Sequence, residues 1–331
     1  MNNIKKIQEK LIEKNLDAVL VTDEKNQRYA TGFPFTDGAV IVARSAAWLI
    51  TDSRYIEAAT NTAACCCNVQ MFDREHSRLS LIQAALKEAG VERLGAEEEK
   101  LSHAEYLGYE KALGMELLPA QAIFSELRAS KSEEEIGYLR EAQAISEKAL
   151  AEVLRIIKPG MTERQVAAEL VYHMLLNGSE GNSFDPIVIT GKKTSMPHGV
   201  PGDEVIHEGD FVTMDFGCLK HGYCSDMTRT VAIGYATDEM KNIYNIVLEA
   251  QLAGIAAARA GIPGYEIDAA ARNVITKAGY GQYFGHGFGH SLGLDIHELP
   301  GANLSGKAIM PVGCAVSAEP GIYIPGKFGV R

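Results

Sequence analysis

The feature that most constrains the fold is a pair of neighbouring β-strand patterns, each carrying an aspartate. Residues 211–217 and 223–231 read as strands joined by a short turn that contains Lys220 and His221. If the turn is centred between these two residues, the antiparallel register places Asp215 directly opposite Asp226, with Cβ atoms about 5 Å apart. Two facing carboxylates repel each other unless a proton or a cation lies between them. The pattern therefore indicates a cation site, although two exposed aspartates near a turn would explain it equally well.

A glycine-rich segment farther along the chain carries His286, His290 and His297, three of the nine histidines. Glycine permits close approach of the backbone, and imidazole both binds metals and carries protons near neutral pH. A lone histidine is usually structural. Three of them in one such segment, in a chain that also has paired aspartates, favour a metal or catalytic site.

Two shorter fragments carry weaker signals. Glu319 ends an apolar stretch before Pro320 and Gly321, and His198 lies in a turn-like sequence between Pro197 and Gly199. Each would be read alone as an exposed residue at a strand end or in a turn.

Composition excludes several classes of protein. The 331 residues have a formal net charge of −11 and no basic run, which disfavours nucleic acids and anionic membranes as partners. No apolar run approaches the roughly 18 residues of a membrane-spanning helix, and the charged N-terminal sequence is not a secretory signal. Three of the six cysteines are consecutive, Cys65 to Cys67, and no C-x-x-C pair occurs. This usage excludes a zinc ribbon and favours reduced thiols in the cytoplasm.

Hydrophobic periodicity predicts two domains, residues 1–123 and 124–331. The first alternates helices with strands, includes a hairpin over 38–51 and has no glycine-rich phosphate loop. The second opens with a long helix after Ser132, a suitable N-cap. Helical pairs end near residues 177 and 278, so the domain has two similar halves, which predicts a pseudo-twofold sheet core with outer helices. Chance recurrence of helical pairs would explain this last feature equally well.

The aspartate pair, the histidine segment and the fragments around Glu319 and His198 together resemble the motifs of the pita-bread metallopeptidases, in the order in which that family has them. The family includes aminopeptidase P, prolidase, methionine aminopeptidase and the non-metal creatinase. The N-terminal third, with residues 51–55 after the hairpin, resembles the creatinase-type N-terminal domain. The resemblance thus covers the whole chain and is strongest to bacterial Xaa-Pro peptidases. It implies an α/β N-terminal domain and an α+β pita-bread catalytic domain.

The resemblance also implies roles for single residues. Two divalent ions, Mn²⁺ or Co²⁺ first and Zn²⁺ after them, would hold a bridging hydroxide that attacks an Xaa-Pro bond. Asp226 would bridge the two ions, and Glu319 would also carry protons. The expected metal ligands are Asp215, Asp226, His290 and Glu319. The residues expected around the substrate carbonyl are His198, His286 and His297, with polar support from Tyr323 and Arg331.

The same resemblance sets the expected activity and its alternatives. We expect a cytoplasmic homodimer that acts on small peptides with proline at the second position, as an aminopeptidase or a dipeptidase. A non-catalytic peptide-binding homologue and an enzyme of the methionine aminopeptidase type are the alternatives. The family has a fifth ligand, a glutamate two residues beyond the position of Arg331. We therefore expect a truncated C-terminal strand, no more than one tightly bound metal and little peptidase activity.

Overall fold

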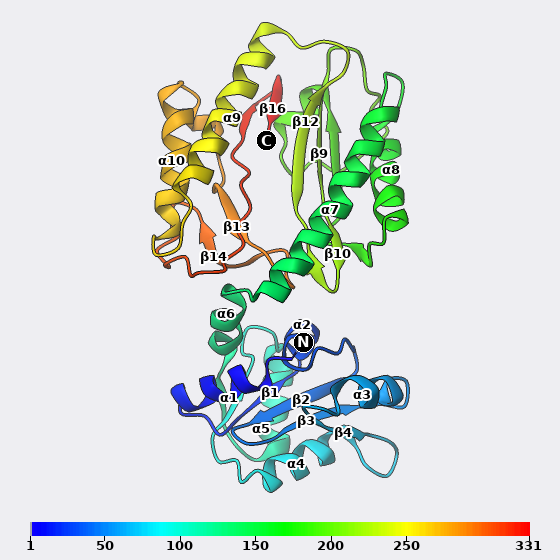
Figure 1. Cartoon of the computed structure of the whole chain (residues 1–331), viewed down its shortest axis with the longest axis vertical. Helices are drawn as coiled ribbons and strands as arrows, with labels where there is room; N and C mark the ends of the chain where they lie inside the picture. Colours follow the sequence, from blue (N-terminus) through cyan, green and yellow to red (C-terminus); the bar gives the residue numbers. More distant parts are fainter. Residues whose placement is uncertain (1) are drawn as a thin grey trace. The chain divides into compact units, whose positions relative to one another are not determined.

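The structure is a computed structural model that describes residues 2–331 and divides into two compact units, Met1–Arg128 and Ala129–Arg331 (Figure 1). The boundary lies near the end of helix α6 (Gln121–Ala129), which the sequence analysis did not predict. The expected boundary between residues 123 and 124 falls inside this helix, where Ile123 and Phe124 are both completely buried. Because α6 buries these side chains, the first unit continues beyond residue 123, as far as Arg128.

The first unit is a six-stranded sheet with the order β4-β3-β2-β1-β5-β6. Strand β2 pairs antiparallel with β3 as the predicted hairpin, whereas β1 pairs parallel with β5. The strands are β1 (Ala18–Val21), β2 (Gly38–Ala43), β3 (Ala47–Thr51), β4 (Asn68–Met71), β5 (Leu94–Ala96) and β6 (Leu117–Pro119). The predicted helices are α1 (Ile4–Glu13), α3 (Ile56–Ala63), α4 (Arg78–Glu88) and α5 (His103–Leu113). The sequence analysis missed α2 (Glu24–Thr31), a polar helix that begins after its N-cap Asp23.

The second unit has two helical pairs and a set of short strands between them (Figure 1). Ser132 caps α7 as predicted, and its side chain accepts a hydrogen bond from the backbone of Glu135. The helices are α7 (Glu133–Ile156), α8 (Glu163–Leu176), α9 (Asp238–Ala257) and α10 (Gly264–Lys277). Helices α7 and α8 lie on one side of strands β9 and β12, and α9 and α10 lie on the other. Each pair buries its own apolar core, one around Met214 and Phe216 and the other around Phe284 and Phe288.

The strands of the second unit form small sheets. A three-stranded sheet has the order β12-β9-β8, and a second has the order β11-β10-β7. The strands of these sheets are β7 (Gly181–Asn182), β8 (Ile187–Thr190), β9 (Phe211–Phe216), β10 (Cys218–Lys220), β11 (Tyr223–Cys224) and β12 (Met227–Ala232). Two further pairs are β13 (Gly289–Ser291) with β14 (Glu298–Ala302), and β15 (Ile322–Ile324) with β16 (Phe328–Val330). Two short 3₁₀ helices, η1 (Gly191–Ser195) and η2 (Gly281–Tyr283), complete the unit.

The hairpin is present, but its predicted register is wrong. Lys220 pairs with Tyr223, so the two-residue turn is His221-Gly222, and Asp215 pairs with Thr228 instead of Asp226. Both turn residues have positive φ, 51° at His221 and 73° at Gly222, as a tight hairpin turn requires. This turn displaces each cross-strand partner by two residues. Asp226 therefore lies in the short interruption between β11 and β12.

Among the helices of residues 2–331, none combines the length and the apolar character needed to span a membrane.

Candidate metal centre

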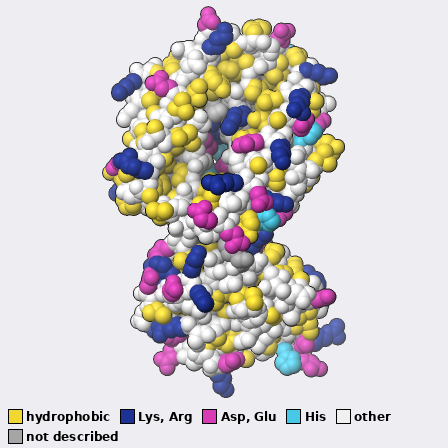
Figure 2. All heavy atoms as spheres, viewed as in Figure 1, with side chains coloured by type: hydrophobic (Ala, Val, Ile, Leu, Met, Phe, Trp, Pro, Cys, Tyr) yellow, Lys and Arg dark blue, Asp and Glu magenta, His cyan; other side chains and the backbone are white. Residues whose placement is uncertain are grey.

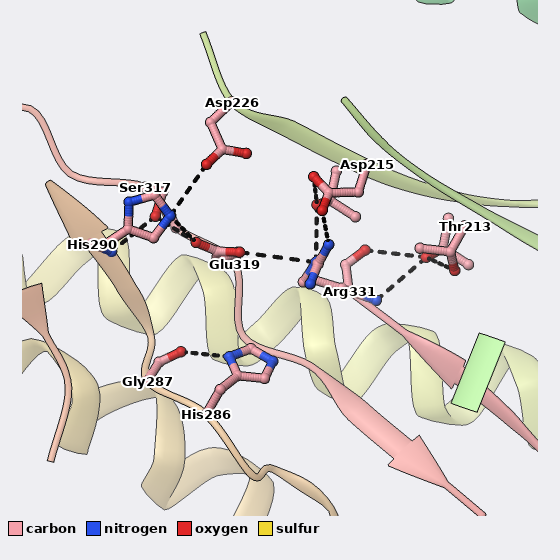
Figure 3. Close-up of polar contacts among 12 residues, drawn as sticks. Thr213, Asp215, Asp226, His286, Gly287, His290, Ser317, Glu319 and Arg331 are labelled. Carbon is pink, nitrogen blue, oxygen red and sulfur yellow. Dashed lines mark hydrogen bonds and ion pairs between the residues drawn. The ribbon is translucent and has the colours of Figure 1, made fainter. Parts of the chain in front are cut away.

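Three of the four expected metal ligands converge. One donor atom from each of Asp226, His290 and Glu319 lies within 4.8 Å of the other two. The Nε2 atom of His290 is 3.2 Å from Oδ2 of Asp226 and 3.2 Å from Oε1 of Glu319 (Figure 3). All three side chains are partly buried. Carboxylate and imidazole donors at this spacing could hold a divalent cation.

The backbone brings the histidine and the glutamate together. The N–H of His290 donates to Oγ of Ser317 at 3.0 Å, and the N–H of Ser317 donates to the carbonyl of His290 at 2.8 Å. The N–H of Glu319 donates to the carbonyl of Phe288 at 2.9 Å. The Ser317 hydroxyl also donates to Oε1 of Glu319 at 2.6 Å, which orients the carboxylate toward His290.

The third donor comes from the interruption in the hairpin. Gly217 lies so close to the other strand that a Cβ atom there would be 2.0 Å from the carbonyl oxygen of Ser225. This close approach fixes the backbone immediately before Asp226. Ser225 is also held by Ser183, whose hydroxyl donates to the Ser225 carbonyl at 2.8 Å.

The fourth expected ligand, Asp215, is beside this group but is not a member of it. Its carboxylate is paired with the guanidinium of Arg331, and both side chains are nearly buried, 10% and 6% exposed (Figure 3). The hydroxyl of Thr228 donates to the other carboxylate oxygen at 2.9 Å. Nε of Arg331 lies 3.9 Å from Oε2 of Glu319, so this guanidinium lies between the two carboxylates.

The proximity of these charges shifts their pKa values in opposite directions. Burial lowers the pKa of His290, but hydrogen bonds to Asp226 and Glu319 outweigh burial and raise it to about 10. Burial raises the pKa of Glu319, but hydrogen bonds from His290 and Ser317 outweigh it and lower the value to about 2. Burial raises the pKa of Asp215 to about 6, in spite of the opposing charge of Arg331. Negative charge at this site thus needs a proton or a cation close by, and His290 and Arg331 lie next to the carboxylates.

His286 and Tyr323 form a second polar pair next to the carboxylates. Nε2 of His286 is 2.8 Å from the hydroxyl of Tyr323, and Nδ1 is 2.8 Å from the carbonyl oxygen of Gly287. A carbonyl can only accept, so Nδ1 carries the proton and Nε2 accepts from the Tyr323 hydroxyl. Burial lowers the pKa of His286 and raises that of Tyr323 to about 12, so both groups are neutral at pH 7.

The other two histidines expected at the substrate are exposed. The ring of His297 stacks edge-on against that of His290, with centroids 4.4 Å apart. Burial and the charge of His290 lower the pKa of His297, and His198 adds a weaker effect in the same direction. The structure therefore places His297 beside the ligand group.

The sequence analysis missed two residues that contact the ligands. Ser317 lies two residues before Glu319, a spacing that puts both on one face of an extended segment. Thr228 would have been found with the correct hairpin register, since it is the cross-strand partner of Asp215.

A cavity of about 870 Å³ reaches this site. Asp226, Ser317, Glu319 and Arg331 contribute to its polar wall, and residues of α7, α9, β12 and the segment 313–320 form much of the rest of its lining. Figure 2 shows the unit of residues 129–331 hollowed near its centre. The carboxylates are therefore accessible to a small ligand.

Comparison with known proteins gives family matches for both units. Residues 137–331 match metallopeptidase family M24, and residues 3–130 match the creatinase/prolidase N-terminal domain. The chain is 42% identical to an uncharacterized peptidase of Bacillus subtilis, over 96% of this chain and 89% of the relative. It is 35% identical to the Xaa-Pro dipeptidase of Pyrococcus horikoshii, over 99% of this chain and 92% of the relative. The solved structure of a Xaa-Pro dipeptidase from Bacillus anthracis superposes with a TM-score of 0.95 at 41% identity, covering 99% of this chain and 92% of that one.

Proposed function

The chain belongs to metallopeptidase family M24, and on that premise we propose that it hydrolyses the Xaa-Pro bond of short peptides. Family membership confirms the predicted fold class and the predicted metallopeptidase chemistry. Relatives named Xaa-Pro dipeptidase align over nearly the whole chain, which supports proline at the second position of the substrate. Another relative is named a putative Xaa-Pro aminopeptidase, so the test below distinguishes dipeptidase activity from aminopeptidase activity.

The observation that carries this proposal is the convergence of Asp226, His290 and Glu319 on one point. These residues fit the divalent ions that the family uses, and we assign Asp215 as the further ligand because it lies beside Glu319 across Arg331. Mn²⁺ or Co²⁺ suits the oxygen-rich donor set best, and Zn²⁺ is the third candidate. When bound, such ions polarise the scissile carbonyl and activate water for attack.

Glu319 is the residue that we assign to proton transfer. Its carboxylate is ionised at neutral pH because its pKa is about 2. The oxygen Oε2 can accept a proton from the attacking water and pass it to the nitrogen that leaves. The nitrogen of any peptide bond needs a proton to leave as a neutral amine, and for an Xaa-Pro bond this proton produces the secondary amine of proline.

We assign His198, His286 and His297 to positions around the substrate carbonyl. His297 is exposed beside the ligand group, and His198 is exposed as well, so that the N–H groups of both are available to stabilise an oxyanion. His286 is fixed by Tyr323 and presents a neutral ring beside Glu319. Proline itself must be recognised by the shape of its ring and by the free amine of the preceding residue, since its nitrogen offers no donor.

The test is hydrolysis of three peptides, each with Mn²⁺, Co²⁺ or Zn²⁺ added to metal-free protein. Release of alanine from Ala-Pro identifies a dipeptidase, and release from Ala-Pro-Ala identifies an aminopeptidase. Met-Ala-Ser, which lacks proline, tests the methionine aminopeptidase alternative. The D226N variant, which lacks one candidate ligand, serves as the negative control in each assay. Cleavage of Met-Ala-Ser alone, or of no peptide in the presence of any of the metals, would overturn the proposal and favour a non-catalytic role.

We also propose that the protein acts as a homodimer in the cytoplasm, on small peptides and not on nucleic acids or membranes. The resemblance to the family supports the dimer, and the net charge of −11 supports the exclusion of anionic partners. Light scattering after size exclusion checks this assembly, and a monomer mass would contradict it.

A further inference from the structure

Helix α10 carries a buried ion pair that the reaction outlined above does not use. Asp268 has no exposed surface, and Arg272 lies one helical turn later. The guanidinium contacts both carboxylate oxygens, with Nε 2.7 Å from Oδ2 and Nη2 3.0 Å from Oδ1. A two-point pair of this kind has a fixed geometry, since both groups are planar.

The same two side chains bind the backbone of the glycine-rich segment at three points. Nη1 of Arg272 donates to the carbonyl of Phe284 at 2.9 Å, and Nη2 donates to the carbonyl of His286 at 2.6 Å. Oδ1 of Asp268 accepts from the N–H of Phe288 at 2.9 Å. The guanidinium also lies over the Phe284 ring, 4.1 Å from its centroid. Every second residue from 284 to 288 is thus attached to one ion pair.

This segment needs such support because its own residues do not restrict it. Gly285 and Gly287 separate the attached residues, Gly289 follows the last of them, and glycine has the widest choice of backbone conformations. His286, on this segment, contacts Tyr323, and His290, two residues beyond Phe288, is a candidate ligand. Figure 3 shows His286 and Gly287 on the side of the site next to Glu319 and His290.

We propose that Asp268 and Arg272 are positioning residues of this active site, which fix residues 284–288 so that His286 meets Tyr323 and His290 meets the two carboxylates. The catalytic part of this inference rests on the proposed function. The structural part does not, because it concerns the ring of His286 and the geometry of the ligand group. Neither residue touches the reacting atoms.

Arginine is required for this role, and lysine cannot replace it. Three nitrogens of Arg272 bind four acceptor sites, two on Asp268 and two on backbone carbonyls. The single ammonium of lysine keeps the charge but cannot reach both carbonyls and the carboxylate in one arrangement. The R272K variant therefore keeps the ion pair and loosens the segment, which separates positioning from simple charge pairing.

The experiment compares R272K and D268N with the control R155K. Arg155 is an exposed arginine on α7 that pairs with Glu152 at 2.7 Å, so R155K makes the same chemical change away from the site. The readouts are kcat and KM for Ala-Pro, Mn²⁺ affinity by equilibrium dialysis, thermal unfolding, and the ¹⁵N spectrum of labelled histidine. H286Q assigns the His286 signals, which in the parent protein should show the tautomer with the proton on Nδ1.

We expect R272K to lower kcat roughly 10- to 100-fold and to leave KM within about threefold, because a small misplacement of a reacting group has effects of this size. Mn²⁺ affinity should fall about tenfold, and the His286 signals should move toward an average of the two tautomers. D268N should behave in the same way. R155K should match the parent protein in each readout.

Each outcome bears on the proposal. A folded R272K or D268N protein with the parent kcat, Mn²⁺ affinity and His286 spectrum would overturn it. Failure of both variants to fold would also overturn it, since the pair would then serve the stability of the unit alone. If the parent protein does not cleave Ala-Pro, the proposed function fails, but the His286 spectrum and the Mn²⁺ affinity still decide whether the pair positions this segment.

Discussion

The guanidinium of Arg331 is paired with the carboxylate of Asp215, and the two side chains are almost excluded from solvent. Burial, and to a smaller extent the charges of Asp226 and Glu319, raises the pKa of Asp215, and the charge of Arg331 opposes that rise. The guanidinium of Arg331 therefore stabilises the ionised form of the buried Asp215 carboxylate. Four predictions concern this pair and the ligand group beside it, and a fifth concerns a buried carboxyl group of the first unit.

Replacing Arg331 by methionine should destabilise the second unit. The R331M variant leaves a buried carboxylate without its cation, which typically lowers the free energy of unfolding by about 3–5 kcal/mol. Differential scanning calorimetry on metal-free protein measures the change. R229M is the control, because Arg229 is an exposed arginine on the neighbouring strand β12. Equal melting curves for the two variants would show that Asp215 does not depend on Arg331.

The D226N variant should fold but bind far less metal. An amide lacks the charge of the carboxylate that joins His290 in the ligand group. Plasma emission analysis after dialysis against Mn²⁺ gives the metal content. D203N serves as the control, since Asp203 is 86% exposed. Metal content equal to that of D203N would remove Asp226 from the ligand set.

Metal binding should release a proton from the metal-free protein. The pKa of His290 is about 10 without an ion, so at pH 7.5 the ring is protonated, whereas a ligating imidazole must be neutral. Calorimetric titration with Mn²⁺ in buffers of different ionisation enthalpy counts the protons, and we expect about one per protein molecule at this pH, from His290. A count that does not differ from zero would mean that His290 is neutral before binding. H207A should release the same number as the parent protein, because His207 is 75% exposed.

The H297A variant should lose activity and keep its metal. His297 contacts the ring of His290 but is exposed and does not belong to the ligand group. A contact made only in the transition state affects kcat and leaves metal content nearly unchanged, so kcat should fall roughly 100-fold. Kinetics on Ala-Pro and metal analysis of the same samples, with H207A in parallel, provide the check. A parallel loss of metal and activity would identify His297 as a ligand.

The stability of the first unit should fall as the pH rises above 4.5, and E97Q should suppress this change. Glu97 is completely buried, and burial raises its pKa above the usual 4.5, although hydrogen bonds from Asp23, Thr22 and Asn26 oppose the rise. The folded state then holds a proton that the unfolded state has lost, so a higher pH favours unfolding through this group.

The single tryptophan makes this measurement specific. Trp48 lies in β3 of the first unit, so its fluorescence in urea reports that unit alone. E88Q, at an exposed position on α4, is the control. Equal pH profiles for E97Q and the parent protein between pH 4.5 and 8 would contradict the prediction.

Hydrophobic periodicity and helix-capping signals were sufficient to predict most helices and strands, but not the register in which the strands pair. The helix after Ser132 was predictable because its cap and acidic first turn are local features. The register of the aspartate hairpin was not, because it depends on the positive φ of His221, a conformation that residues other than glycine rarely adopt. Helix α2 was missed because its sequence is almost wholly polar, while its tertiary environment buries it.

The candidate site divides in the same way. His290 and Glu319 could be identified because their motifs resemble those of a known family, and the structure brings them together. The pairing of Arg331 with Asp215 joins residues 116 positions apart, which local sequence cannot reveal. Arg272 was not singled out at all, because its partners include backbone carbonyls, which every residue possesses.

The two cores of the second unit contribute different parts of the ligand group. Asp226 lies within the hairpin that packs in the core of α7 and α8, whereas His290 and Glu319 belong to segments packed with α9 and α10. An ion held by all three would therefore act as a non-covalent cross-link that closes long loops of the chain. Its removal would take away this cross-link, so protease sensitivity of the segments that carry the ligands would become a measure of occupancy.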